Sequence, residues 1–230
     1  MSKIYRYRLL ALTILTALLF TLSGVPTALA AHTTAQNDLK GVWVSTVYNL
    51  DYPNSGTTSA TALRQQADAI LENCEKMGCN AIFLQVRPTA DSFYDSSLFP
   101  WSKYCTGQQG VAPNENFDPL AYWVTEAHKR GIELHAWINP YRITKDKESD
   151  WNKLTTDHPA KQHPEWVVKH SDGNYYFNPG IPEVRQLVVD GALEIVENYD
   201  VDGIHLDDYF YPGSELADNS TYSKYGDDFD

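Results

Sequence analysis

The sequence predicts an α/β fold, more specifically the N-terminal half of a (β/α)8 TIM barrel with four parallel strands and outer helices. Four apolar segments alternate along the chain with amphipathic helical patterns, and these segments are too hydrophobic for strands that expose one face. The segments that follow the strands are long and aromatic, whereas each link from a helix to the next strand has one to four residues. This asymmetry is typical of barrels whose strand-to-helix loops carry the site.

A doubly wound parallel sheet is the alternative fold. Such sheets commonly carry a glycine-rich loop after the first strand, and no such loop follows the first apolar segment here. The alternative is therefore weaker than the barrel.

Each expected element has a local justification. The four strands are short apolar runs: GVWVSTVY at 41–48, NAIFLQVRP at 80–88, IELHAWIN at 132–139 and VDGIHLDDY at 201–209. The first helix, at 58–77, repeats apolar residues every three to four positions and ends at Gly78. The second, at 119–130, has a good N-cap in Asp118 and a good first residue in Pro119. The third, at 182–199, also begins with a proline.

The first thirty residues have the pattern of a secretory signal peptide. Three basic residues precede an apolar run of 14 residues at 9–22, and an Ala-Leu-Ala cleavage site follows at 28–30. The run is shorter than the roughly 20 residues that a membrane span needs. The sequence therefore predicts a signal peptide at 1–30, a flexible leader at 31–39 and a barrel domain at 40–230. It also predicts export to the cell envelope or the medium, with no stable membrane anchor after cleavage.

Charge and cysteine content narrow the partners and the kind of site. The formal charge is −12 and becomes −15 without the three basic residues of the signal peptide, which argues against nucleic acid as a partner. The three cysteines, Cys74, Cys79 and Cys105, are interpreted as buried thiols, and a Cys74–Cys79 or Cys79–Cys105 disulfide is the alternative. No C-x-x-C pair occurs and the histidines are scattered, so the sequence predicts no metal site and no cofactor.

Alternation along the strands places polar side chains on one face of the expected sheet. Each strand has an aliphatic side, which should meet the helices, and a side that turns polar near its C-terminal end. The upper polar members are Ser45, Arg87, Asn139, His205 and Asp207, with Gln85 and His135 one layer lower and Trp137 on the same side. Burying such groups without partners is costly, so their convergence on one end of a barrel indicates a site. A self-satisfied polar network that plugs the barrel is the alternative.

Asp207 is the strongest catalytic candidate. An inward carboxylate at the tip of the fourth strand can act as nucleophile, acid or base, whereas Asp208 points the other way by alternation. Glycoside hydrolysis needs two carboxyl groups, about 5–5.5 Å apart for retention or about 6.5–9.5 Å apart for inversion. Asp202, at the start of the strand, is interpreted as a turn residue.

The residues around the strand tips suit a sugar. Aromatic rings can stack on the C–H faces of a pyranose, and the candidates are Tyr48, Tyr94, Trp101, Trp137, Tyr141, Tyr209 and Tyr211. Arg87 and Arg142 can bind a carboxylate or hydroxyl groups with a forked geometry. With His135 and His205, these residues predict a binding site for an oligosaccharide or polysaccharide.

Five segments together resemble one bacterial family, the glycosyl-hydrolase-like family 10 domain. They are GVWVSTVYNLDYP, FLQVRPTADSFYDSSLFPWSKYCTG, FDPLAYWVTEAHKRGIELHAWINPYR, YYFNPGIPEVR and DGIHLDDYFYP, and the resemblance covers about residues 40–212. It implies a (β/α)8 barrel, export and glycan hydrolysis, with cell-wall glycans of the peptidoglycan type as a substrate class.

The resemblance also implies functional residues. They are Asp207 and Asp208 in HLDDY, Asn139, Tyr141 and Arg142 in NPYR, Arg87 and Asp91 in RPTAD, and Asn178 in NPG. The catalytic candidates are thus Asp207, Asp208 and Asp91. The candidates for substrate binding are Arg87, His135, Trp137, Asn139, Tyr141, Arg142, Asn178, His205 and Tyr209.

The chain departs from the family pattern in one respect. The family domain continues through four further βα units, and residues 213–230 are polar and acidic with no strand pattern. We therefore expect a truncated domain that lacks any carboxylate of the later strands. Two alternatives to a glycoside hydrolase stay open: a non-catalytic glycan-binding module or inactive fragment, and a metal-dependent hydrolase that uses His135, His205 and Asp207.

Overall fold

The computed structural model describes residues 38–207, 210, 212–213 and 216–226. The chain divides into two units, residues 1–38 and residues 39–230. Of the first unit, only Asp38 is described. The predicted signal peptide and most of the leader lie outside the described residues. In the part that is described, no helix has the length and apolar character needed to cross a membrane.

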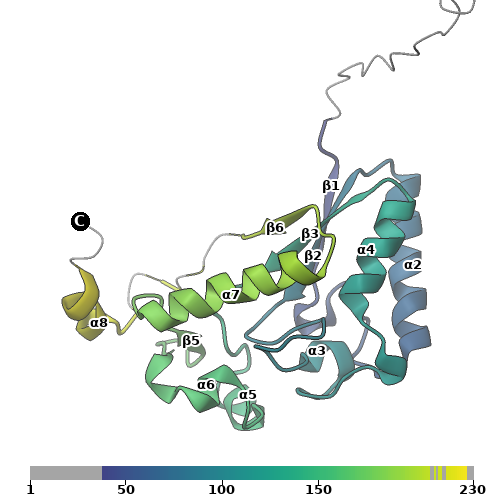
Figure 1. Cartoon of the computed structure of the whole chain (residues 1–230). Helices are drawn as coiled ribbons and strands as arrows, with labels where there is room; N and C mark the ends of the chain where they lie inside the picture. Colours follow the sequence, from purple (N-terminus) through teal and green to yellow (C-terminus); the bar gives the residue numbers. More distant parts are fainter. Residues whose placement is uncertain (1–37, 208–209, 211, 214–215, 227–230) are drawn as a thin grey trace, which may run out of the picture. The chain divides into compact units, whose positions relative to one another are not determined.

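A four-stranded parallel sheet forms the centre of residues 39–230 (Figure 1). Its strands are β1 (Gly41–Val44), β2 (Ala81–Arg87), β3 (Glu133–Ile138) and β6 (Gly203–His205), and they lie side by side in chain order. A doubly wound sheet reverses its strand order at a switch point, and this sheet does not. The predicted α/β fold with four parallel strands is therefore confirmed, and the doubly wound alternative is wrong.

The three predicted helices are present and connect the strands. They are α2 (Ala60–Lys76), α4 (Pro119–Lys129) and α7 (Pro182–Asn198). The Asp118 side chain caps α4 by accepting a hydrogen bond from the backbone N–H of Ala121, as its sequence position predicts. Apolar residues of all three helices join the aliphatic side of the sheet in one core, which includes Leu71, Trp123 and Ile195. The helices therefore cover one face of the sheet, and we call the opposite face the axial face.

The segments after the strands contain short elements that the sequence pattern did not predict. The loop after β2 holds α3 (Lys103–Thr106), and the loop after β3 holds α5 (Lys147–Lys153), α6 (Pro159–Gln162) and the antiparallel pair β4 (Val167–Lys169) and β5 (Tyr175–Phe177). Helix α8 (Asn219–Tyr225) lies in the polar, acidic segment in which the sequence shows no strand pattern. Single-turn 3-10 helices occupy Val47–Asn49, Asn114–Asn116 and Pro164–Trp166. The loop residues pack around a second apolar cluster that includes Phe99, Ile143 and Phe177.

The two outer strands are shorter than predicted. The first was expected at 41–48 but ends at Val44, and the fourth was expected at 201–209 but covers Gly203–His205. Each has a partner strand on one side only, and the backbone of Tyr48 adopts a positive φ that is incompatible with a strand. The cysteine prediction holds for Cys74 and Cys105, which are buried free thiols, and Cys79 is a free thiol of intermediate exposure.

Candidate active site

A chain of hydrogen-bonded side chains crosses the C-terminal ends of all four parallel strands. The Gln85 amide nitrogen donates to Asn139 Oδ1 at 2.6 Å, and the Asn139 amide nitrogen donates to Asp207 Oδ1 at 2.8 Å. On the other side, Gln85 Oε1 accepts from the Ser45 hydroxyl at 3.1 Å. We call these four residues the polar relay. Ser45 follows β1, Gln85 lies in β2, Asn139 follows β3 and Asp207 follows β6, so each strand supplies one member.

The donors around Gln85 fix the orientation of both side-chain amides in the relay. Gln85 Oε1 also accepts from the backbone N–H groups of Thr46 and Val47, each at 3.0 Å. Donors on this oxygen force the amide nitrogen of Gln85 toward Asn139, and this in turn points the amide nitrogen of Asn139 at the carboxylate of Asp207. Asp207 Oδ2 has no hydrogen-bond partner within the described residues. The relay therefore holds one carboxylate oxygen and leaves the other for a ligand.

A Gln85→Glu substitution tests this directional argument. The second glutamate oxygen would face Asn139 Oδ1, so the Asn139 amide must turn and present its oxygen to Asp207. We expect about tenfold slower turnover of any substrate that uses Asp207, and a loss of about 1–2 kcal/mol in the free energy of unfolding. Chemical denaturation and initial rates measure the two effects. Ser45→Ala is the matched control, because it removes one of the four donors to Gln85 Oε1 without changing the orientation of the amide. An equal effect of both variants would contradict the argument.

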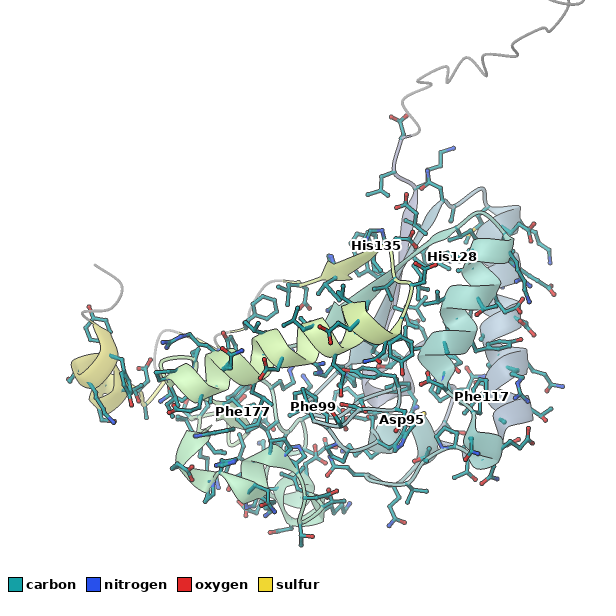
Figure 2. All side chains as sticks on the ribbon, in the orientation of Figure 1. Asp95, Phe99, Phe117, His128, His135 and Phe177 are labelled. Atoms are coloured by element: carbon teal, nitrogen blue, oxygen red, sulfur yellow. The ribbon has the colours of Figure 1, made fainter. Side chains whose placement is uncertain are left out.

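Aromatic rings cover the axial face below the relay. Phe83 is the centre of this group, with ring centroids 4.6 Å from Trp43, 4.9 Å from His135 and 4.7 Å from His205. Trp137 lies edge-on to His205 at 6.3 Å. Figure 2 shows His135 beside β6, where a Cβ on Gly203 would come within 2.5 Å of the His135 ring. The predicted side of the sheet is thus confirmed for His135, Trp137 and His205.

Trp43 and His205 are joined across the open side of this aromatic group. The Trp43 indole N–H donates to His205 Nε2 at 3.1 Å, although the two residues lie in the two outer strands. An indole nitrogen is only a donor, so the bonded imidazole must carry its proton on Nδ1. Trp43 is 53% exposed, which makes it the accessible part of the aromatic surface.

Arg87 does not face the axis, and the prediction of its orientation is wrong. A β-bulge lies between Gln85 and Arg87, so that Arg87 pairs in register with Ile138 on the helix side of the sheet. Its guanidinium donates to the Tyr94 hydroxyl and to the Gly191 carbonyl of α7, and stacks on Phe99 at 4.2 Å. Phe99 lies beneath α7 in Figure 2. The bulge adds one residue and reverses the alternation, so Arg87 joins the strand to α7 and is 1% exposed.

An Arg87→Lys substitution should weaken this contact between β2 and α7. An ammonium group cannot make both hydrogen bonds and also stack flat on Phe99, so we expect the free energy of unfolding to fall by about 2 kcal/mol. Gly191 supports the same reading, because a Cβ there would lie 2.7 Å from the guanidinium. Urea denaturation measures the effect. Arg64→Lys is the control, since Arg64 makes an exposed ion pair with Glu115, and a larger loss for Arg64 would contradict the assignment.

Three predicted binding residues lie in the loops above the sheet. Both polar atoms of the Asn178 side chain are hydrogen-bonded. Its nitrogen donates to the Thr221 hydroxyl of α8 at 2.7 Å, and its oxygen accepts from the backbone N–H of Gly180 at 3.0 Å. Tyr141 is half-buried against the second apolar cluster, and burial raises the pKa of its hydroxyl. Arg142 is half-buried and donates to the Pro88 carbonyl at 3.4 Å. The structure thus gives Asn178 a structural role and leaves the binding roles of the other two as predictions.

Asp91 is separated from the polar relay by its surroundings. Its carboxylate is buried among loop residues, with Thr89, Ser102 and Gln109 close enough to stabilise the charge. No hydrogen bond joins Asp91 to Asp207 among the described residues. Asp208 and Tyr209 lie outside the described residues, so the catalytic role of Asp208, the binding role of Tyr209 and the role of Asp91 stay predictions.

Gln85 is the site residue to which sequence reasoning gave no role. Alternation placed it one layer below the strand tips, whereas the structure makes it the residue that orients the relay. The signal in the sequence is a single amide inside an otherwise apolar strand, AIFLQVR, in which all seven residues are buried. A buried amide requires several partners, so a polar residue at such a position indicates a network. The other members, Asn139 and Asp207, are brought together as predicted.

Comparison with known proteins identifies relatives of the chain. The family described as glycosyl hydrolase-like 10 matches residues 38–229. Glycosyl hydrolase YngK from Bacillus subtilis is 46% identical over 86% of this chain and 39% of its own length. Glycosyl hydrolase DigH from Escherichia coli K12 is 38% identical over 83% of this chain and 47% of its own length.

Solved structures give a more distant likeness. The maltogenic α-amylase AmyB from Thermotoga neapolitana aligns with 82% of this chain and 42% of its own, at 18% identity and a TM-score of 0.44. The chain spans 39% of the length of YngK and 47% of the length of DigH, which is less than half of each of these curated relatives.

Proposed function

Because the chain belongs to the glycosyl hydrolase-like 10 family, we propose that it works as a secreted glycoside hydrolase domain with Asp207 as a catalytic carboxylate. The observation that carries this proposal is the polar relay, which ends on Asp207 with one oxygen held and the other open. A carboxylate held in this way is suited to act on a glycosidic bond as nucleophile, acid or base.

The aromatic axial face supports a sugar as the substrate. Trp43 and Trp137 offer flat apolar rings next to the relay, and sugars bury their C–H faces on such rings. The relatives YngK and DigH are both named as glycosyl hydrolases. We propose a polysaccharide substrate, with bacterial cell-wall glycans as the class to test first. Export through the predicted signal peptide would bring the protein to that substrate.

A second carboxylate is required for this chemistry. We propose Asp91, Asp208 or a carboxylate from the part of the relatives' length that this chain does not cover. A metal-dependent reaction is the weaker alternative, because no group of three His, Cys, Asp or Glu residues in the described part of the chain is arranged to hold a metal ion.

A non-catalytic glycan-binding module is the second candidate function. The exposed Trp43 ring favours it, because sugars stack on accessible aromatic rings, and the polar relay contains a single carboxylate, Asp207. Binding and hydrolysis are separable by measurement, so the two functions can be distinguished.

The experiment incubates the purified protein with soluble glycan strands prepared from peptidoglycan. New reducing ends are counted with time, and binding of the same strands is measured by calorimetry. We expect new reducing ends, equal rates with and without a chelator, and weaker binding by a Trp43→Ala variant. Binding without product would favour the non-catalytic module. Loss of activity after chelation, restored by a divalent cation, would favour the metal-dependent reaction.

A further inference from the structure

A separate cavity lies in the loop layer, away from the axial face. Its volume is about 410 Å3, within the range of about 300–1,000 Å3 that is usual for small-molecule sites. The loop after β2 supplies Asp91, Lys103 and Gln109, and the loop after β3 supplies Ile143, Asp150 and Lys153. No member of the polar relay lines it. We call it the loop cavity.

Asp91 presents an unused acceptor to the loop cavity. The residue is 1% exposed, and its Oδ1 has no hydrogen-bond partner within the described residues. A buried carboxylate oxygen without a donor is unfavourable and unusual in a folded protein. A ligand with a donor group would satisfy it.

The charged neighbours of Asp91 are engaged with one another. Lys103 donates to Asp150, and Asp150 Oδ2 also accepts from the backbone N–H groups of Lys145 and Asp146, each at 2.9 Å. Lys103 also lies 3.4 Å from Asp146. The charge of Lys103 therefore favours the Asp91 carboxylate only from a distance. Among the described residues no cation forms an ion pair with Asp91, and an ammonium group on a ligand would provide one.

The opposite charge at the cavity is that of Lys153. This lysine is exposed and makes no ion pair within the described residues. Ile143, which is 2% exposed, and Leu154 add apolar surface between the two charged sides. The lining contains no aromatic residue among the described ones, so the ring platform that a sugar prefers is not part of it.

We propose that the loop cavity binds a small zwitterionic ligand of amino-acid type, with its ammonium group on Asp91 and its carboxylate toward Lys153. The aliphatic surface of Ile143 and Leu154 suits an aliphatic side chain. The ligand is a free amino acid or a dipeptide, since each carries one ammonium group and one carboxylate. This binding is separate from the polar relay, because the relay and the loop cavity share no residue.

The test is calorimetric titration of the whole protein with matched probes at neutral pH. L-leucine carries both charges, 3-methylbutylamine only the ammonium, 4-methylpentanoate only the carboxylate, and glucose neither. L-alanyl-L-leucine distinguishes a peptide from a free amino acid. We expect L-leucine or the dipeptide to bind with a dissociation constant in the roughly millimolar range or below, and the single-charge probes to bind at least about tenfold more weakly.

Variants locate the binding. Asp91→Asn is expected to weaken binding by about tenfold or more and Lys153→Gln by a few fold, because each removes one charge partner. Lys76→Gln is the matched control, since Lys76 is an exposed lysine on α2 that pairs with Glu72, and it should bind as the unchanged protein does. Thermal melting confirms that the variants are folded. Absence of binding by both zwitterions, equal affinity of Asp91→Asn, or tighter binding of glucose would each overturn the proposal.

Discussion

Replacement of Asp207 with asparagine is expected to slow glycoside hydrolysis by about 10³-fold with little change in the fold. The asparagine side chain has the shape of aspartate, and its oxygen can accept the hydrogen bond that Asn139 donates at 2.8 Å. The polar relay therefore keeps its pairing. The variant lacks a carboxylate at the open position, so it has neither a nucleophile nor an acid or base there.

The measurement is kcat and KM on soluble cell-wall glycans, with binding measured separately. We expect kcat to fall and the affinity for the glycan to change little, because the aromatic face is untouched. Asp202→Asn is a suitable control from the same segment. Asp202 accepts from the backbone N–H of Leu134 at 2.7 Å and contacts His128 at 2.9 Å, so it has the structural role that its position at the strand start predicts. If Asp207→Asn turns over the glycan at the original rate, the catalytic assignment is wrong.

Helix caps, strand alternation and short connections are local or periodic features of the sequence. They predicted the helix ends, the side chains on each face of the sheet and the strand order. The cap of α4 needs only Asp118 and the next three residues, and it is present as predicted. Strand alternation needs only regular pleating, and it correctly placed Asn139, His205 and Asp207 on one side. The chain order of the strands follows from short helix-to-strand links, which leave little freedom in where the next strand joins the sheet.

Features that depend on distant partners were not predictable in this way. The bulge that turns Arg87 away from the axis is a shift in the register between β2 and β3. The Arg87 guanidinium donates to the carbonyl of Gly191, which is distant in the sequence. Asn178 was assigned to the site by resemblance, but its amide bonds Thr221 in a helix that has no apolar periodicity. The short helices of the loops lack periodic patterns for the same reason. Tertiary contacts decide these features, and a single sequence does not display them.

The buried carboxyl group of Asp91, which lines the loop cavity, is expected to make the stability of the fold depend on pH. Burial raises the pKa of its carboxyl from 3.8 to about 6, although hydrogen bonds from Thr89, Ser102 and Gln109 oppose the change. Below pH 3.8 the carboxyl is protonated in both the folded and the unfolded chain. Between these two pKa values the unfolded chain releases the proton and the folded one keeps it, so the folded state loses stability as the pH rises. Above pH 6 the full loss remains.

Asp91→Asn removes this loss. We therefore expect the substitution to raise the free energy of unfolding more at pH 7 than at pH 4. The difference of about 2 pKa units corresponds to about 3 kcal/mol, or a rise of roughly 6–12 °C in Tm for a domain of this size. Thermal melts at the two pH values measure it. Such a gain fits a residue kept for ligand binding at the expense of stability.

Asp150→Asn is the matched control, because Asp150 lines the same cavity and should show the opposite sign. Burial raises the pKa of Asp150, but hydrogen bonds from Lys103 and from the backbone of Lys145 and Asp146 outweigh it and hold the pKa below its usual value. Its charge therefore adds stability at neutral pH that is lost in acid, and Asp150→Asn should lower Tm at pH 7. If Asp91→Asn also lowered Tm at pH 7 more than at pH 4, the ionised Asp91 would have a compensating partner within the protein. The loop cavity would then offer no unmet negative charge, and the case for an ammonium ligand would fail with it.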